Sequence, residues 1–289
     1  MTLLLSLGKI RISLLVTLMA AESYTLAVGQ TSMRMLLPMT AVLLLACGAC
    51  GLNQYQERRT DGLMERTRGR PIPSGRLSPS VALWISLGLI SSGLFVLLFV
   101  AGGEVSVLGI LAVFWYNGVY TFLKRRTAFA GVPGALVGSI PPVMGWVSGG
   151  GSLFDPGIWA IAFFIFLWQV PHGWLLQIAF EKDYRRAGLP CLPDLFKTEQ
   201  LKRILYVWIL STSASCLLIP LFVLIHFHAV SLFLLAGTLC LMAHATISLR
   251  FGADGACFKS VFVTLNAYAF SVLLLLSLDR VLVSSALNP

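Results

Sequence analysis

The chain has 289 residues, of which 57% are hydrophobic and 11% are charged, and its formal net charge is +9. This composition excludes an ordinary soluble domain, because apolar runs long enough to cross a bilayer recur along the whole chain. We therefore expect an all-α, polytopic protein of the lipid bilayer, in which residues 1–289 form a single integral-membrane domain.

Hydropathy predicts about nine membrane-spanning helices, with boundaries defined to within about four residues. The first is interrupted by Glu22 and Ser23, and the others are continuous. The predicted spans are residues 12–29, 35–52, 80–101, 105–123, 132–150, 157–180, 204–225, 229–249 and 260–278.

The basic residues lie almost entirely on one side of this nine-span arrangement. The loops and termini of one side carry 19 of the 21 Lys and Arg residues, and only Arg34 and Arg280 fall on the other. Because cytoplasmic loops carry an excess of Lys and Arg, we expect a cytoplasmic amino terminus. The positive charge therefore indicates membrane orientation and no nucleic-acid partner.

The beginning of the chain favours a retained first helix. Lys9 and Arg11 precede a long apolar span, which fits an uncleaved helix better than a removed signal peptide. An Arg- and Ser-rich transit segment is missing, so we favour the cytoplasmic membrane of a prokaryote over the mitochondrial inner membrane. Cys47 and Cys50 form a CxxC pattern inside a span, where we expect small packing residues.

The end of the second span carries the first chemical motif. Residues 53–71 hold eight charged side chains, and Asn53, Glu57 and Asp61 are spaced i, i+4, i+8. If the second helix continues beyond the lipid, these three oxygen-bearing side chains share one face, as ligands for a hard cation such as Mg²⁺. Arginines around them match phosphate. A solvated loop following the positive-inside rule would explain the arginines, but not the register of the acids.

A second acidic cluster follows the sixth span. Glu181 and Asp183 stand beside three basic residues on the same predicted side, and Lys124 lies between the two clusters in sequence. Two such clusters facing each other can hold metal ions on both sides of one diphosphate. The sequence therefore predicts a diphosphate site with an active-site cavity at the cytoplasmic face.

Four motifs extend this interpretation. They are NxxxExxxDxxMERTRxRP (53–71), YNGVYTFLKRRT (116–127), GSIPPVMGW (138–146) and WQVPHGW…DYRRAGLPCLP (168–193). In this order they resemble the protoheme IX farnesyltransferases, or heme O synthases, of the UbiA-type membrane prenyltransferases. The shared residues are mostly polar, Gly or Pro, so hydrophobicity alone does not produce the resemblance. It implies a nine-helix bundle with an aspartate-lined cytoplasmic cavity.

The resemblance also implies a reaction and a set of residues. Farnesyl diphosphate would donate its farnesyl group to a vinyl group of heme b, with Mg²⁺ as cofactor and water supplying the hydroxyl of heme O. An association with downstream heme-modifying or oxidase-assembly proteins is a further implication. The implied catalytic and metal-binding residues are Asn53, Glu57, Asp61 and Asp183; those for the diphosphate are Arg66, Arg70 and Lys124; and those for the heme pocket are His172, Trp168, Trp174 and Tyr184.

Three positions depart from the family pattern. Glu57 stands where Asp is usual, Lys182 replaces the first of two aspartates, and Gly173 replaces the Phe of PHFW. These changes keep open a diverged relative, such as a prenyltransferase that acts on a quinone precursor or another aromatic acceptor. A third class is a transporter or heme-handling protein without catalysis. The transporter is disfavoured, because the charges cluster at one face and we find no internal repeat.

Overall fold

The computed structural model describes residues 3–30, 32–252 and 256–287. Nine helical segments in these ranges are long and apolar enough to cross a membrane, and no strand occurs there. This confirms the expected all-α membrane bundle. The elements are α1 (Leu3–Leu7), α2 (Ile10–Val28), η1 (Met33–Met35), α3 (Leu36–Leu63), α4 (Pro79–Val100), α5 (Gly103–Val113), η2 (Phe114–Tyr120), α6 (Thr121–Leu123), η3 (Ala128–Ala130), α7 (Gly131–Ser148), α8 (Pro156–Ala179), α9 (Glu181–Arg186), η4 (Leu192–Asp194), α10 (Thr198–Leu218), η5 (Ile219–Leu221), α11 (His228–Phe251) and α12 (Ala256–Leu287).

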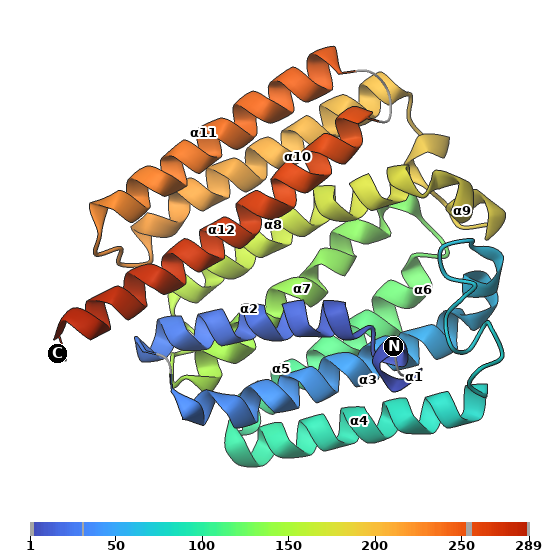
Figure 1. Cartoon of the computed structure of the whole chain (residues 1–289), viewed down its shortest axis with the longest axis horizontal. Coiled ribbons are helices and arrows are strands. Elements are labelled where there is room, and N and C mark those ends of the chain that lie inside the picture. The colour runs from blue at the N-terminus through green and yellow to red at the C-terminus, as the bar shows by residue number, and fades with distance from the viewer. Residues whose placement is uncertain (1–2, 31, 253–255, 288–289) are drawn as a thin grey trace.

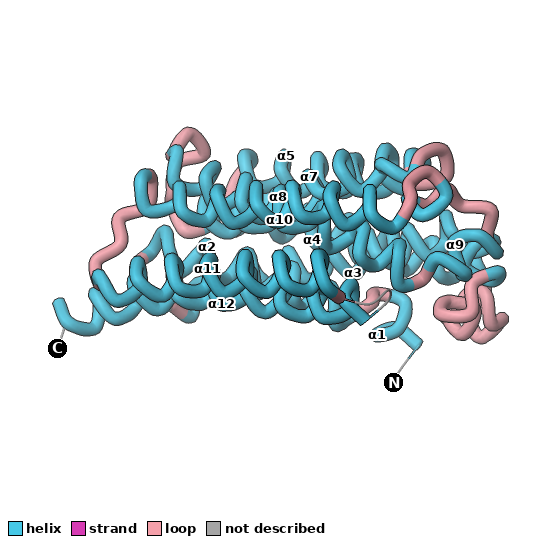
Figure 2. Tube along the Cα trace, turned by 90° about the horizontal axis from the view of Figure 1, so that it is seen from above, coloured by secondary structure: helices cyan, strands magenta, loops and turns pink. Residues whose placement is uncertain are grey.

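The long helices run side by side along the longest axis of the molecule (Figure 1). Viewed from above, they form two layers, and the connecting loops gather at the two ends (Figure 2). The helix α3 packs on α4 and α2, α2 on α7, and α12 contacts both α8 and α2. We call the end that carries α9 and segments 64–78 and 124–127 the basic end (Figure 1).

The helix α3 is longer than its predicted span. It runs from Leu36 to Leu63, whereas hydropathy ends the span at residue 52. The last three turns carry polar residues that are nevertheless buried, with Asn53, Glu57 and Asp61 exposed by only 2%, 5% and 3%. A hydropathy scan stops at the first polar turn, but here the helix continues because other parts of the chain pair with these side chains.

The fourth span is not a uniform α-helix. Between α5 and α6, residues Phe114–Tyr120 form the π-helical segment η2. Such segments widen the helix locally and occur often at functional sites. Here the side chain of Asn117 donates to the carbonyl of Ala49 on α3 at 3.0 Å, and Gln56 donates to the carbonyl of Asn117 at 3.0 Å. These bonds fix η2 against the polar half of α3.

Glycines let α3 and α4 approach closely. A Cβ placed on Gly48 would lie 2.8 Å from the backbone of Ser86 and Ile90, and one on Gly93 would lie 2.9 Å from the backbone of Ala41. Helices in membranes commonly pack through small residues in this way. The contact gives α3 a fixed support on the side away from its acidic face.

Candidate active site

Asn53, Glu57 and Asp61 on α3 each accept a hydrogen bond from a basic residue in another part of the chain. The ammonium of Lys124 donates to both oxygens of Glu57 at 3.0 and 3.3 Å. The guanidinium of Arg70 donates to Oδ2 of Asp61 at 2.6 Å. Since α3 continues through residue 61, the three acceptors face one way over successive turns, as the spacing predicted.

The third partner is Lys9, whose ammonium donates to Oδ1 of Asn53 at 2.8 Å. Lys9 lies between α1 and α2 with φ 46° and ψ 51°, the only non-glycine residue with positive φ in the described chain. Burial lowers the pKa of Lys9. This conformation is uncommon for a residue with a Cβ, and it turns the chain so that the side chain reaches α3. In the sequence, Lys9 is recognisable only as one of the basic residues that indicate membrane orientation.

Neighbouring groups orient these side chains. The amide nitrogen of Asn53 donates to the hydroxyl of Thr121 at 3.1 Å, which leaves its oxygen facing Lys9. Burial lowers the pKa of Lys124, but the Glu57 carboxylate together with Tyr120 and Tyr184 raises it more, so the pKa is raised overall. Thr67 donates to the carbonyl of Asp61 at 2.9 Å and holds the loop that carries Arg70. The α3 acids and their basic partners are thus firmly placed.

The donor set on α3 fits a hard cation. One amide oxygen and two carboxylates are the ligand types that Mg²⁺ prefers, and a magnesium ion commonly completes its shell with water and phosphate oxygens. No group of three His, Cys, Asp or Glu side chains suited to a metal ion occurs within residues 3–30, 32–252 and 256–287. A cation at this site would therefore depend on the amide of Asn53 and on oxygens from the substrate.

Asp183 has a different environment from the α3 residues. Its two carboxylate oxygens accept the backbone N–H groups of Glu65 at 2.9 Å and Arg66 at 3.1 Å. The N–H of Arg66, supported by that of Glu65, lowers the pKa of Asp183. The carboxylate therefore fastens the start of the α3–α4 loop to α9. The assignment of Asp183 as a metal ligand stays a prediction.

The guanidinium of Arg66 lies over the Phe180 ring, 4.7 Å from its centre. Together with Glu65, Phe180, Lys182 and Asp183 it lines an open pocket of about 610 Å³ at the basic end. Of the three residues predicted for the diphosphate, Arg70 and Lys124 therefore contact the α3 acids. Arg66 also lies at the basic end, on the loop between α3 and α4.

The four residues predicted for the acceptor pocket are not gathered at one place. Nδ1 of His172 lies 2.8 Å from Oδ1 of Asn266 on α12, and the rings of His172 and Trp168 are 5.1 Å apart. Trp174 points elsewhere and packs on Trp208 of α10 with ring centres 5.6 Å apart. Tyr184 packs with residues 64, 189 and 191. Only Trp168 and His172 therefore share a surface.

That surface borders a cavity between α2, α8 and α12. The cavity has a volume of about 390 Å³, and Trp168, Asn266 and the carboxylate residue Glu22 line it together with apolar side chains. The indole nitrogen of Trp168 is buried and has no hydrogen-bond partner in the described part of the chain. The cavity thus offers polar groups inside the membrane, which are costly unless they serve a ligand or partner.

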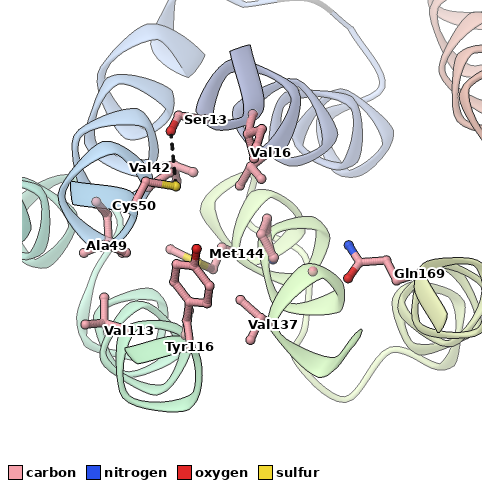
Figure 3. Close-up of a pocket in the computed structure, with 16 residues that line it drawn as sticks. Ser13, Val16, Val42, Ala49, Cys50, Val113, Tyr116, Val137, Met144 and Gln169 are labelled. Atoms are coloured by element: carbon pink, nitrogen blue, oxygen red, sulfur yellow. Dashed lines mark hydrogen bonds between the residues drawn. The ribbon is translucent and has the colours of Figure 1, made fainter. Parts of the chain in front are cut away.

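A second, almost wholly apolar cavity lies at the centre of the bundle (Figure 3). Its volume is about 210 Å³, and α2, α3, α5, η2, α7 and α8 contribute to its wall. On α3 it is lined by Val42, Ala46, Ala49 and Cys50, one turn before Asn53. Positions 49, 53, 57 and 61 are each four residues apart, so one continuous face of α3 changes from cavity wall to acidic site.

The cysteines contribute to packing. All six are free, and Cys50 lines the central cavity with its sulfur 4.0 Å from the hydroxyl of Ser13. A Cβ on Gly8 would lie 3.0 Å from the side chain of Cys47, so this cysteine packs directly against the α1–α2 junction. The CxxC pattern on α3 therefore consists of small residues at a helix contact, as expected.

Comparison with known proteins agrees with this arrangement. The model of the UbiA prenyltransferase family matches residues 13–274. A protoheme IX farnesyltransferase of Oleidesulfovibrio alaskensis is 35% identical over 98% of both chains. Another, from Geobacter sulfurreducens, is 42% identical over 75% of this chain and 80% of its own.

Solved structures share the fold at low sequence identity. A digeranylgeranylglyceryl phosphate synthase superposes with a TM-score of 0.79 at 13% identity, covering 96% of this chain and 98% of its own. A UbiA homolog from Archaeoglobus fulgidus bound to GPP and Mg²⁺ gives 0.65 at 16% identity, covering 94% and 99%. These likenesses establish the architecture of the bundle.

Proposed function

The chain belongs to the UbiA prenyltransferase family, and from this premise we propose that it transfers a farnesyl group from farnesyl diphosphate to a vinyl group of heme b, giving heme O. The proposal takes residues 1–289 as one integral-membrane domain with its amino terminus in the cytoplasm of a prokaryotic cell. The names of the curated relatives support the choice of prenyl donor and acceptor.

The observation that carries the proposal is the division of one helix face into two chemical halves. The apolar cavity begins at Val42 and ends near Cys50, and the acidic site begins at Asn53 on the next turn. A prenyl diphosphate has the same division, with an apolar chain joined to a charged head. The prenyl chain would lie in the central cavity, and the diphosphate would lie beside Asn53, Glu57 and Asp61.

Bound Mg²⁺ would supply charge neutralisation to the diphosphate, with Asn53, Glu57 and Asp61 as its protein ligands and Asp183 as a further predicted ligand. Lys124 and Arg70, which bond to Glu57 and Asp61, would bind the diphosphate oxygens, and Arg66 would support them from the loop. The bond between carbon 1 of the prenyl chain and oxygen breaks, and its electron pair leaves with the diphosphate.

The acceptor completes the reaction. The terminal carbon of the vinyl group bonds to carbon 1 of the farnesyl chain, water adds to the inner vinyl carbon, and that water releases a proton. We place the heme near Trp168 and His172, because Trp168 lines the cavity between α2, α8 and α12 and the His172 ring lies 5.1 Å from that of Trp168. A Cβ on Gly173 would meet no atom within 4 Å, so the usual Phe is replaced by open space beside this pair.

The test is product analysis with the purified chain. Incubation with Mg²⁺, farnesyl diphosphate and heme b should yield heme O by mass spectrometry, and omission of Mg²⁺ should remove the product. Heme binding followed in the Soret band should saturate, and His172→Ala should weaken it more than it slows diphosphate release. Prenylation of a hydroxybenzoate or naphthoate without saturable heme binding would assign the chain to the alternative, aromatic-acceptor class.

A further inference from the structure

The wall of the central cavity contains a polar group that the proposed reaction has not yet used. Gln169 of the WQVPHGW motif lines the cavity from α8, and its amide points toward α7 (Figure 3). It forms no hydrogen bond with any other residue that the structure describes, whereas Gln177 on the same helix bonds to Ala128 and Leu192. An amide without a protein partner in an almost wholly apolar wall indicates that it bonds to a ligand.

Gly138 of the GSIPPVMGW motif makes room for this amide. A Cβ on Gly138 would overlap both Nε2 and Oε1 of Gln169, so any larger residue would displace the amide from its place against α7. Gly138 lines the same cavity. Two motifs that lie apart in the sequence therefore meet here, and the glycine of one sets the position of the glutamine of the other.

The prolines of α7 add hydrogen-bond acceptors to the same part of the wall. Pro141 and Pro142 lie inside the helix and have no N–H, so they cannot donate to the carbonyls of residues 137 and 138, four positions earlier. Val137 and Gly138 both line the central cavity. A small space with one amide and two carbonyls that lack their usual helical partner suits a water molecule, which makes about three hydrogen bonds when buried.

Gln169 also lies between the two spaces assigned to the substrates. It faces the central cavity, where the prenyl chain would lie, and it is next to Trp168 and one turn before His172, where we place the heme. Cys50 and Tyr116 line the same cavity, near its acidic end. The reacting carbons of the two substrates must meet where these spaces meet, so a water molecule bound to Gln169 would lie beside them.

We propose that the amide of Gln169, with the backbone carbonyls of residues 137 and 138, holds the water molecule that becomes the hydroxyl group of heme O; this inference rests on the proposed function. When carbon 1 of the farnesyl chain bonds to the terminal vinyl carbon, the inner vinyl carbon is left with a positive charge. A lone pair of the water oxygen then forms the new carbon–oxygen bond. One proton of that water passes to the diphosphate released in the same reaction.

The alternative fate of the same cation supplies a test. Without a water molecule in place, the cation loses a proton from the adjacent carbon to the diphosphate, and the product is an alkene that lacks the hydroxyl group. This dehydrated product is lighter than heme O by one water, so mass spectrometry separates the two. Their ratio reports on the position of the water molecule, and a role of Gln169 in folding alone would leave it unchanged.

Two variants remove the water site in different ways. Gln169→Met keeps the approximate size of the side chain but removes the amide, and we expect the ratio of dehydrated product to heme O to rise about tenfold, as for the loss of one hydrogen bond. Gly138→Ala keeps the amide but displaces it, and should raise the ratio by a similar factor. The effects of the two substitutions should not add in the double variant, because both remove the same water molecule.

Gln177→Leu is the matched control, since it removes a glutamine of the same helix whose bonds are made within the protein. It should leave the product ratio as in wild type, even where it lowers the yield of folded protein. An unchanged ratio in Gln169→Met or Gly138→Ala would overturn the proposal, as would an equal rise in Gln177→Leu. If Gln169→Met forms no product, the ratio in Gly138→Ala decides. A wild-type chain that forms neither product would contradict the proposed function itself.

Discussion

At the scale of residues, the acidic face of α3 is held by basic partners from distant parts of the chain. The i, i+4, i+8 spacing requires only that the helix continue, so Asn53, Glu57 and Asp61 could be predicted from the sequence. The bond from Lys9 to Asn53 joins residues 44 positions apart and depends on a left-handed turn between α1 and α2. Spacing along the chain carries no information about such a contact. Trp168 and Trp174 likewise lie in different surroundings, because different neighbouring helices pack against the two sides of α8.

The first prediction concerns the acids themselves. We expect Asp61→Ala to lower the rate of prenyl transfer by about thirty- to a thousandfold, since electrostatic groups of this kind contribute about 2–4 kcal/mol to the barrier. Glu57→Asp should keep or raise the rate, because it preserves the charge and restores the usual ligand length. Initial rates in saturating Mg²⁺ check both variants. Wild-type turnover by Asp61→Ala would show that α3 does not bind the diphosphate.

The second prediction concerns Lys9. Lys9→Met removes the ammonium beside Asn53, and we expect KM for farnesyl diphosphate to rise about ten- to hundredfold, as expected for the loss of a charged hydrogen bond. Lys9→Arg should recover part of the loss, because it keeps a cation at the junction. Arg11→Met, two positions along the chain and exposed, serves as the control and should leave KM unchanged. A normal KM in Lys9→Met would limit Lys9 to a structural role.

At the scale of elements, hydropathy located every span but not the irregularities that build the site. The extension of α3 to Leu63 and the π-helical segment Phe114–Tyr120 both lie where polar side chains replace lipid as the neighbour. A hydropathy window averages over such positions. The wall of the central cavity comes from helices distant in sequence, and the hydropathy of one span does not show which helices pack together.

The third prediction concerns this cavity. Val42 lies on α3 two turns deeper than Cys50, at the end away from Asn53. Val42→Phe should shorten the space for the prenyl chain, so kcat/KM should fall about tenfold more with farnesyl diphosphate than with geranyl diphosphate. Val81→Phe, exposed on the outer side of α4, is the matched control and should affect both substrates equally. If Val42→Phe lowered kcat/KM equally for the two diphosphates, the prenyl chain would bind outside this cavity.

At the scale of the whole molecule, the membrane bundle followed from composition, while the orientation remains a prediction from charge. Nineteen of the 21 basic residues belong to one predicted side. The segments that carry them after α3, α6 and α8 lie together at the basic end (Figure 1). The sequence could give this grouping because each crossing reverses the chain direction, so successive loops alternate between the two sides of the bilayer.

The fourth prediction tests orientation by cysteine labelling. Native Cys191 is unsuitable, because it is fully buried and its thiol donates to Asp194 at 2.9 Å. Cysteines are therefore introduced at exposed Lys182 of the basic end and at Phe154, which is 88% exposed near the opposite end, with Cys240 replaced by Ser. A membrane-impermeant maleimide should label Phe154→Cys in intact cells and Lys182→Cys only after permeabilisation. The reverse labelling pattern would show that the orientation in the membrane is opposite to the predicted one.

The pairing of Lys9, Lys124 and Arg70 with the α3 residues has a consequence for how the site is filled. Lys124 and Arg70 form ion pairs with the two carboxylates, whereas Lys9 bonds to the neutral amide of Asn53, so three cations and two carboxylates leave one excess positive charge. A metal ion alone would compete with these cations, and a diphosphate alone would compete with the carboxylates. When both arrive together, Lys124 and Arg70 can exchange a carboxylate for a diphosphate oxygen while the metal ion binds the carboxylates, and Lys9 gains an anionic partner. The site therefore favours the metal ion and the prenyl diphosphate together over either one alone, and we expect the two to bind with positive cooperativity.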